Sequence, residues 1–185
     1  MDGDLHAVVL VEGLSDQIAL ETLAARRGRN LESEGVRVIP IGGAQAIGRF
    51  LDEFGRRRVR LAGLCDVGEE SDFRRALESA GHGSALTRSG MEELGFYVCV
   101  EDLEDELIRA HGAAAVERVV EGQGELRSFR TLQKQPAWDG RPADEQLHRF
   151  MGSGGRRKIR YARLLVEALD LDRMPRPLDG VLRHV

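Results

Sequence analysis

The sequence predicts an α/β protein: a roughly four-stranded, mainly parallel sheet flanked by helices, followed by a helical C-terminal extension. Over the first hundred residues, short β-branched runs alternate with helical stretches, which is the pattern of parallel strands joined by crossover helices. Beyond residue 104 the strand signals stop and only helical stretches follow. We therefore expect an α/β domain over residues 1–110, with a helical extension over residues 111–185 packed on it.

Each expected element has its own signal. Four apolar, β-branched runs predict strands: HAVVLVEG at 6–13, VRVIPI at 36–41, VRLAGLCD at 59–66 and GFYVCV at 95–100. Ser15 is a candidate N-cap for the first helix, which we expect to end near Gly28. Further helices are expected at 42–54, 69–80, 105–112, 113–122, 126–135, 143–152 and 157–171. Glycine and serine predict a loop over 81–90, and the prolines of MPRPLDG predict an extended segment at 174–180.

The composition limits the class of protein. A 185-residue chain with 42% hydrophobic and 31% charged residues fits one globular, soluble domain and excludes disordered and collagen-like classes. No apolar run approaches the roughly 20 residues of a membrane span, and no basic leader precedes the first strand. We expect a cytoplasmic protein without a membrane partner. Cys65 and Cys99 lie in apolar runs, which favours buried free thiols.

Acidic side chains follow three of the predicted strands. Glu12 ends the first strand and Asp16 comes four residues later; Asp66 ends the third strand, followed by Gly68, Glu69 and Glu70. The fourth strand leads into Glu101, Asp102, Glu104, Asp105 and Glu106. Because ligands of open parallel sheets bind beyond the carboxyl ends of the strands, we expect these acids to meet at one rim. The plainer alternatives are acids that stabilise helix N-termini and, for the run after 100, a solvated face.

The chemistry of such a cluster points to a metal ion. Carboxylates held close together raise each other's pKa values unless a cation compensates them. Oxygen ligands without Cys or His neighbours suit Mg²⁺ or Mn²⁺ rather than zinc. Such ions activate water and neutralise charge on a phosphoryl group. His111 and His148 show no spacing typical of a zinc site or a catalytic triad, so we expect them to be structural or exposed.

The sequence also resembles a known family. VVLVEGLSDQIAL is similar to the first motif of Toprim (topoisomerase-primase) domains, and GLCD to the second. The acid at Asp16 and the segment FYVCVEDLEDELI resemble the C-terminal Toprim half of the OLD (overcoming lysogenisation defect) family nucleases. This resemblance implies that Glu12, Asp16, Asp66 and Glu104 hold metal, with Gly13 and Gly68 allowing close backbone approach. It also implies a basic residue from the C-terminal helices, for which Lys158 is the candidate; the other lysine is Lys134.

The chain departs from the family pattern in two places. The DxD element reads Asp66-Val67-Gly68, so its second carboxylate is missing, and Glu69 or Glu70 would have to replace it. No G-x-x-x-x-G-K-[ST] loop occurs in the sequence, although OLD nucleases carry an ATPase domain ahead of the Toprim part. We therefore expect the chain to act alone or with a separate ATPase partner.

A basic segment near the C-terminus is the candidate nucleic-acid surface. Arg156, Arg157, Lys158 and Arg160 follow a glycine-rich approach, and arginine forks suit phosphate oxygens. The alternative is an amphipathic helix whose arginines are solvated.

Together these observations favour a Mg²⁺-dependent nuclease, in the first place an endonuclease, or a related phosphodiester-cleaving enzyme. Its substrate would be DNA or RNA, with DNA favoured, and Glu12, Asp66 and Lys158 would be its catalytic residues. The absence of a priming or zinc module disfavours nucleotidyl transfer. The main alternative is a non-catalytic metal- or nucleic-acid-binding module that docks on an ATPase or repair partner. A small phosphate-ester hydrolase with the same acidic site is a third hypothesis.

Overall fold

The computed structural model describes residues 5–57 and 59–185. At its centre is a four-stranded sheet with the strand order β2-β1-β3-β4, in which every neighbouring pair is parallel. The strands are β1 (Ala7–Val11), β2 (Val36–Pro40), β3 (Arg60–Cys65) and β4 (Phe96–Val98). The predicted α/β class with a four-stranded parallel sheet is confirmed.

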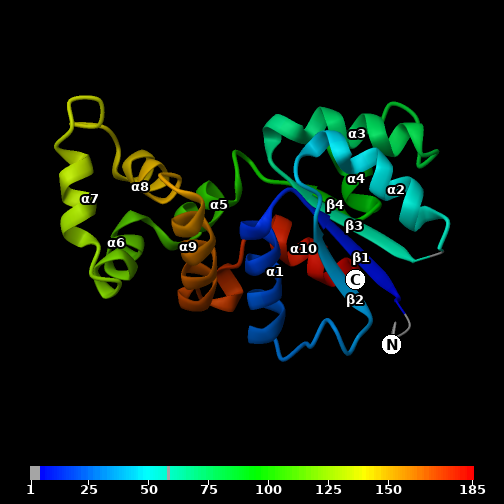
Figure 1. The fold of residues 1–185 in the computed structure, drawn as a ribbon, viewed down its shortest axis with the longest axis horizontal. Coiled ribbons are helices and arrows are strands. Elements are labelled where there is room, and N and C mark those ends of the chain that lie inside the picture. The colour runs from blue at the N-terminus through cyan, green and yellow to red at the C-terminus, as the bar shows by residue number, and fades with distance from the viewer. Residues whose placement is uncertain (1–4, 58) are drawn as a thin grey trace.

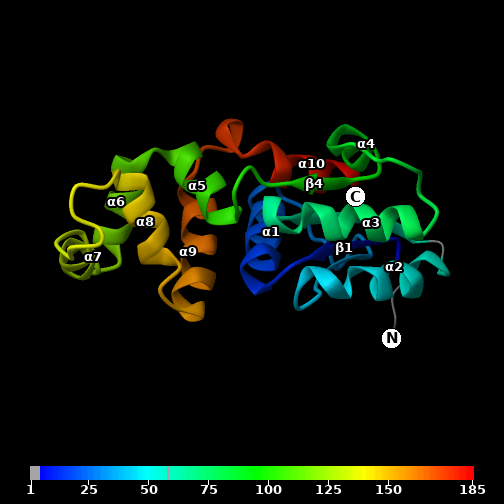
Figure 2. The same ribbon diagram turned by 90° about the horizontal axis from the view of Figure 1, so that it is seen from above.

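The helices divide between those that lie against the sheet and a second group beside it (Figures 1 and 2). The helices against the sheet are α1 (Leu14–Arg26), α2 (Ile47–Gly55), α3 (Glu70–Ser79), α4 (Arg88–Glu93) and α10 (Arg176–His184), with the short 3-10 helices η1 (Ala44–Ala46) and η2 (Val67–Glu69). The second group is α6 (Ala113–Gly122), α7 (Leu126–Gln133), α8 (Ala143–Met151) and α9 (Gly155–Ala168). Helix α5 (Leu103–His111) follows β4 and packs against α6, α8 and α9, and the 3-10 helix η3 (Leu171–Arg173) connects α9 to α10.

The central strand β1 is buried on both faces, which accounts for its unbroken apolar sequence. Because side chains alternate along a strand, Val9 and Val11 enter one hydrophobic core, and Val8 and Leu10 enter the other. Helices α1 and α10 cover the first face, and α2 and α3 cover the second. The sheet is therefore a rigid platform whose strand ends lead into loops at one edge.

Helices α6 to α9 form a group of their own that is anchored to the sheet through α1. Inside the group, Phe150 packs edge-on against both Phe129 and Tyr161. Helix α9 lies along α1, and Arg26 of α1 donates hydrogen bonds to the carbonyl oxygens of Val166 (2.7 Å) and Leu169 at the end of α9. These contacts fix α9 beside the strand ends, although it is distant from them in sequence.

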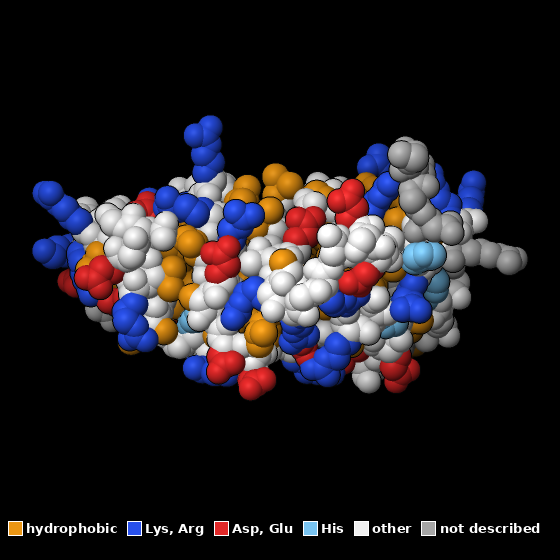
Figure 3. Space-filling model, turned by 90° about the horizontal axis from the view of Figure 1, so that it is seen from below, with side chains coloured by type: hydrophobic (Ala, Val, Ile, Leu, Met, Phe, Trp, Pro, Cys, Tyr) orange, Lys and Arg blue, Asp and Glu red, His pale blue; other side chains and the backbone are white. Residues whose placement is uncertain are grey.

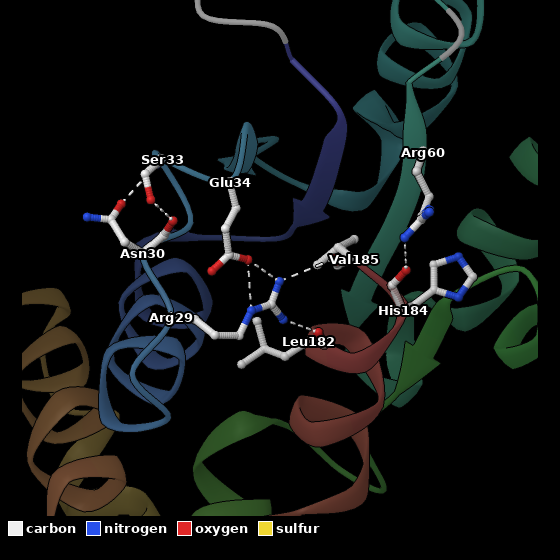
Figure 4. A network of polar contacts seen from close by, with 8 residues as sticks. All are labelled: Arg29, Asn30, Ser33, Glu34, Arg60, Leu182, His184 and Val185. Atoms are coloured by element: carbon white, nitrogen blue, oxygen red, sulfur yellow. Dashed lines mark hydrogen bonds and ion pairs between the residues drawn. The ribbon is translucent and has the colours of Figure 1, made fainter.

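The last helix returns from the helical group to the sheet, where it packs on β3 and β4. Figure 4 shows how its end is held: Arg29 donates to the carbonyl oxygens of Leu182 and Val185 (3.2 Å), and Arg60 donates to that of His184 (3.0 Å). Glu34 in turn holds the Arg29 guanidinium, with its Oε2 2.9 Å from Nε. The last carbonyl groups of a helix lack partners within it, so these arginines supply the missing donors.

Three expectations about local structure are wrong. Residues 176–180 are not extended but begin α10, because proline is tolerated in the first turn of a helix, where its missing N–H is not needed. The loop expected over 81–90 ends at Thr87, whose side chain accepts a hydrogen bond from Gly90 and caps α4. The first helix is capped at Gly13 rather than at Ser15, which lies inside its first turn.

The expectations about the cysteines, membrane spans and domain division have different outcomes. Cys65 and Cys99 are buried free thiols, as predicted. Within the described ranges, no helix is long and apolar enough to cross a membrane. The division between residues 110 and 111 stays a prediction; α10, from the predicted extension, packs directly on the sheet.

Candidate metal centre

The parallel sheet places Glu12 beside Asp66. Strands β1 and β3 are paired with Val11 opposite Leu64, so Glu12 at the end of β1 is level with the end of β3. Asp66 follows β3 directly, and the N–H of the next residue, Val67, donates to the carbonyl oxygen of Glu101 beyond β4 (3.1 Å). The ends of three neighbouring strands therefore meet at one rim, as the sequence predicts.

Glu69 joins this pair through a tight turn. Asp66 caps the 3-10 helix η2, and the N–H of Glu69 donates to the Asp66 carbonyl oxygen at 3.0 Å. Side chains three residues apart eclipse in a 3-10 turn, so the Glu69 carboxylate lies on the same side as that of Asp66. Ligand oxygens of Glu12, Asp66 and Glu69 lie within 4.8 Å of one another; we call these residues the carboxylate triad. Glu70, the other candidate, instead pairs with Arg88.

Burial and mutual repulsion disfavour the charged forms of the triad carboxylates. Burial raises the pKa of Asp66 to about 8, with help from the charges of Asp16 and Glu12. Burial and the nearby charge of Glu69 also raise the pKa of Glu12. One carboxylate oxygen of Glu12, Oε2, is buried without a hydrogen-bond partner among the described residues. A cation bound among these carboxylates would stabilise their charged forms.

Asp16 borders the triad and also serves the helix. Its Oδ2 accepts a hydrogen bond from the Gly13 N–H at 2.9 Å, which closes the first turn of α1. Burial raises its pKa to about 6, and its charge in turn acts on Asp66. Both the helix-capping and the site interpretations of Asp16 therefore have a structural basis.

Lys158 reaches the rim from α9 and meets Glu104. The Lys158 Nζ lies 3.0 Å from Glu104 Oε2, and the Glu104 side chain is only 4% exposed. Burial raises the pKa of Glu104, although the Lys158 cation opposes this effect. For Lys158 burial acts to lower the pKa, but the charge and hydrogen bond of Glu104 outweigh it and raise the pKa, so the amine stays protonated. The structure thus places this candidate cation beside the acids.

The remaining candidates lie in different surroundings. Arg157 and Arg160 both pair with Glu125, which also accepts a hydrogen bond from the Tyr161 hydroxyl (2.8 Å). Arg156 is exposed and has no acidic partner in the described part of the chain. A Cβ on Gly68 would meet open space, whereas a Cβ on Gly13 would lie 3.7 Å from Asp16 Oδ2. Nucleic-acid binding by the basic segment stays a prediction.

The pair of His148 and Asp102 at the rim was not predicted from the sequence. His148 Nε2 of α8 lies 2.6 Å from Asp102 Oδ2, while Asp102 Oδ1 caps α5 by accepting from the Asp105 N–H (2.8 Å). His148 and Asp102 are 46 residues apart, and no spacing rule joins them. The only signal was the position of Asp102 just beyond a strand end, next to other acids.

Comparison with known proteins agrees with this arrangement. Residues 6–67 match the family model described as "Overcoming lysogenization defect protein-like, TOPRIM domain". These residues contain β1, β2 and β3 together with Glu12, Asp16 and Asp66. Over these residues the chain is similar to an OLD-like Toprim domain. Among proteins with curated descriptions, none matches the sequence.

Solved structures of OLD proteins extend the likeness beyond the Toprim segment. The C-terminal region of the Burkholderia pseudomallei OLD protein superposes with a TM-score of 0.74 at 18% identity, covering 98% of this chain and 97% of that one. The C-terminal region of the Xanthomonas campestris pv. campestris OLD protein gives 0.72 at 20% identity, covering 96% and 93%. At these identities the likeness establishes the fold, including the helical group after the Toprim segment.

Proposed function

We propose that this protein is a Mg²⁺- or Mn²⁺-dependent nuclease that cleaves phosphodiester bonds of DNA at the carboxylate triad. The observation that carries the proposal is the convergence of Glu12, Asp66 and Glu69 at the strand ends of an OLD-like Toprim fold. The Lys158 cation, held by Glu104 at the same rim, supports it.

The triad has the donor chemistry of a hard divalent cation. Its ligand atoms are all carboxylate oxygens, which Mg²⁺ and Mn²⁺ prefer. Glu12 Oε2 is buried without a partner in the described part of the chain, and the pKa of Asp66 is raised; a bound cation would stabilise both carboxylates. Asp16 and Glu104, which border the triad, would complete the negative surroundings of the ion.

The residues at the rim suggest separate roles for the ion, Glu12 and Lys158 in the reaction. A bound ion would activate water and neutralise charge on the scissile phosphate. Glu12, with its raised pKa, would accept a proton from the attacking water. Lys158, fixed by Glu104 and protonated, would stabilise the negative charge that develops on the phosphate oxygens.

DNA is the proposed polymer, and the exposed Arg156 is the first candidate for phosphate contact outside the rim. Arg157 and Arg160 would contribute only if a phosphate replaced Glu125 as their partner. The face in Figure 3 shows acidic and basic side chains interspersed, which does not favour that face as a polyanion surface. The rim itself, where Lys158 meets the triad, is the better candidate.

A non-catalytic module is the second proposal, and Gly68 is the observation that favours it. The second position of the DxD element has no carboxylate, so the site could bind one ion without cleaving. The solved relatives are C-terminal regions of OLD proteins. Under this proposal the chain would bind metal and nucleic acid and act together with an ATPase.

A cleavage panel separates these proposals. Purified protein is incubated with supercoiled plasmid, linear duplex, single strands and structured RNA, each with Mg²⁺, Mn²⁺ or chelator. Glu12→Gln and Asp66→Asn each remove one charge from the triad and are expected to abolish metal-dependent cutting. Glu32→Gln and Asp139→Asn change exposed acids outside the rim and serve as matched controls.

Each result has a separate meaning. The nuclease is established, and its polymer identified, if the wild type and both control variants cut a substrate with metal while Glu12→Gln and Asp66→Asn do not. Calorimetric Mn²⁺ binding that depends on Glu12 and Asp66, without cutting of any substrate, supports the non-catalytic module. Cutting that survives Asp66→Asn would refute the triad as its source.

A further inference from the structure

The Asp102–His148 pair lies at the rim but has no part in the function proposed above. Asp102 follows β4 and caps α5, and its charge acts on Asp66 on one side and is felt by Lys158 on the other. His148 comes from α8 in the helical group. The pair therefore connects the helical group to the strand ends beside the triad.

The geometry of the pair leaves one ring nitrogen of His148 available to a ligand. His148 uses Nε2 to contact Asp102 Oδ2 at 2.6 Å, and no hydrogen bond to another described residue occupies Nδ1. The His148 side chain is 44% exposed, twice the 22% of Asp102. A ring held at one nitrogen and open to solvent at the other can offer that second nitrogen to a ligand.

The surrounding charges favour the cationic form of the ring. The hydrogen bond to Asp102, together with the charges of Asp102, Glu104 and Asp105, raises the pKa of His148, although its partial burial opposes this. With Nε2–H directed at the carboxylate, the protonated ring carries its other N–H on Nδ1. When it is protonated, His148 is therefore a second cationic donor beside the acidic residues of the rim.

We propose that His148 is a substrate-binding residue of this site: held by Asp102, it donates through Nδ1 to a backbone phosphate of the bound strand next to the scissile one. This inference rests on the proposed function, because it takes the ligand to be a polynucleotide. It assigns Asp102 as the positioning residue, since Asp102 orients the ring but need not touch the strand. A phosphate held there and one at Lys158 would fix the direction in which the strand crosses the rim.

The test uses variants that separate the structural tie from the phosphate contact. In His148→Gln the side-chain amide can still donate to Asp102, but the charge and the second ring nitrogen are lost. Asp102→Asn keeps a good helix cap while it removes the carboxylate that orients the ring. His111→Gln is the matched control, because His111 is also half-buried and uses one ring nitrogen, bonded to the Leu165 carbonyl oxygen at 2.8 Å.

Binding of a fluorescent single-stranded DNA oligonucleotide is measured by anisotropy in chelator at about pH 6, where the imidazole is charged. His148→Gln is expected to weaken binding roughly 10-fold, the size of one charge-assisted hydrogen bond. The slope of log K against log salt should fall by about 0.7, which a merely structural role would not change. Asp102→Asn should weaken binding less, and His111→Gln should leave affinity and slope unchanged.

Two outcomes would overturn the inference in different ways. If the wild type binds the oligonucleotide and His148→Gln matches it in affinity and salt slope, His148 has no phosphate contact, while the proposed function stands. If the wild type binds no oligonucleotide in chelator and cuts no substrate of the cleavage panel with metal, the nucleic-acid function fails and the inference fails with it. Melting temperatures of all variants confirm that each is folded.

Discussion

The two parts of the molecule that meet at the rim contribute different kinds of groups. The sheet contributes the carboxylate triad from segments that end neighbouring strands, within one continuous α/β unit. From the helical group, basic side chains reach acids at the rim across packed helices: Lys158 from α9 pairs with Glu104, and His148 from α8 pairs with Asp102. Under the proposed function, the sheet side would hold the ion and the helical side would face the charge of the substrate.

This difference implies that metal binding and substrate handling can be separated by mutation. The triad oxygens are placed by backbone register, so they should bind a cation even when the helical cations are removed. Lys158 and His148 depend on the packing of α9 against α1 and of α8 against α5. A change on the helical side should therefore affect catalysis and binding of the strand more than binding of the ion.

The largest effect is expected from Lys158→Ala. Loss of this cation should lower metal-dependent cleavage by roughly 100-fold or more, since one donor aimed at developing charge is typically worth that much. Mn²⁺ binding, measured by calorimetry, should persist, in contrast to its loss in Glu12→Gln. Lys134→Ala is the matched control because Lys134 is the only other lysine, exposed at the end of α7.

The separation fails if Lys158→Ala loses Mn²⁺ binding as completely as Glu12→Gln does. That result would show that the lysine mainly offsets the charge of the buried Glu104 and so maintains the acidic site. Glu104→Gln then distinguishes the two roles. Glu104→Gln removes the charge that Lys158 compensates. The double variant Lys158→Ala, Glu104→Gln would therefore recover metal binding only if the uncompensated charge of Glu104 had caused the loss.

The sheet side of the site could be predicted from sequence because its geometry is local and periodic. An apolar strand ending in Glu12 and another ending in Asp66 must bring these acids to one edge if the strands are parallel neighbours. The choice between Glu69 and Glu70 could not be made in advance. It depends on the 3-10 turn of η2, which directs Glu69 toward Asp66 and leaves Glu70 to Arg88.

The helical side could not be predicted in this way. Lys158 was suggested only by a family resemblance, and the Asp102–His148 pair is formed by the packing of α8 on α5, which no sequence period records. Pro175 and Pro177 predict an extended segment, but the first turn of a helix tolerates proline, and α10 begins there.

A smaller effect is expected when the missing acid is restored. Gly68→Asp rebuilds the DxD pattern at a position where a Cβ meets open space and the backbone is not left-handed. We expect it to raise Mg²⁺ affinity and cleavage about 10-fold, because an added ligand carboxylate strengthens a cation site. Gly122→Asp adds the same charge at an equally open glycine in α6 and should change neither quantity.

Gly68→Asp also tests whether Glu69 takes the place of the second DxD carboxylate. Glu69→Gln alone should lower cleavage, and Gly68→Asp combined with Glu69→Gln should restore it. A double variant no more active than Glu69→Gln would mean that the two positions are not equivalent. The sheet side would then need the position of Glu69 itself, one 3-10 turn from Asp66.

The smallest effect is a pH-dependent change of stability in chelator. The folded pKa of Asp66 is about 8, whereas the unfolded carboxyl titrates near about 4, so the folded state binds more protons between these values. The free energy of unfolding should therefore fall as pH rises through this window. Because Asp66 is only half-buried, water screens part of the effect, and we expect a melting temperature lower by roughly 3 °C at the alkaline end.

Asp66→Asn isolates the contribution of Asp66. The other titrating groups are present in both proteins, so their effects cancel when the melting temperature of the wild type is subtracted from that of the variant. The difference in melting temperature between variant and wild type should widen as pH rises from about 5 to about 9 in chelator. Excess Mg²⁺ should reverse the wild-type trend, since an ion bound at the triad favours the charged carboxylate and gains affinity as the proton leaves. A difference that stays constant with pH, with and without Mg²⁺, would mean that Asp66 is not strained by its neighbours and that the sheet side is not a preformed ion site.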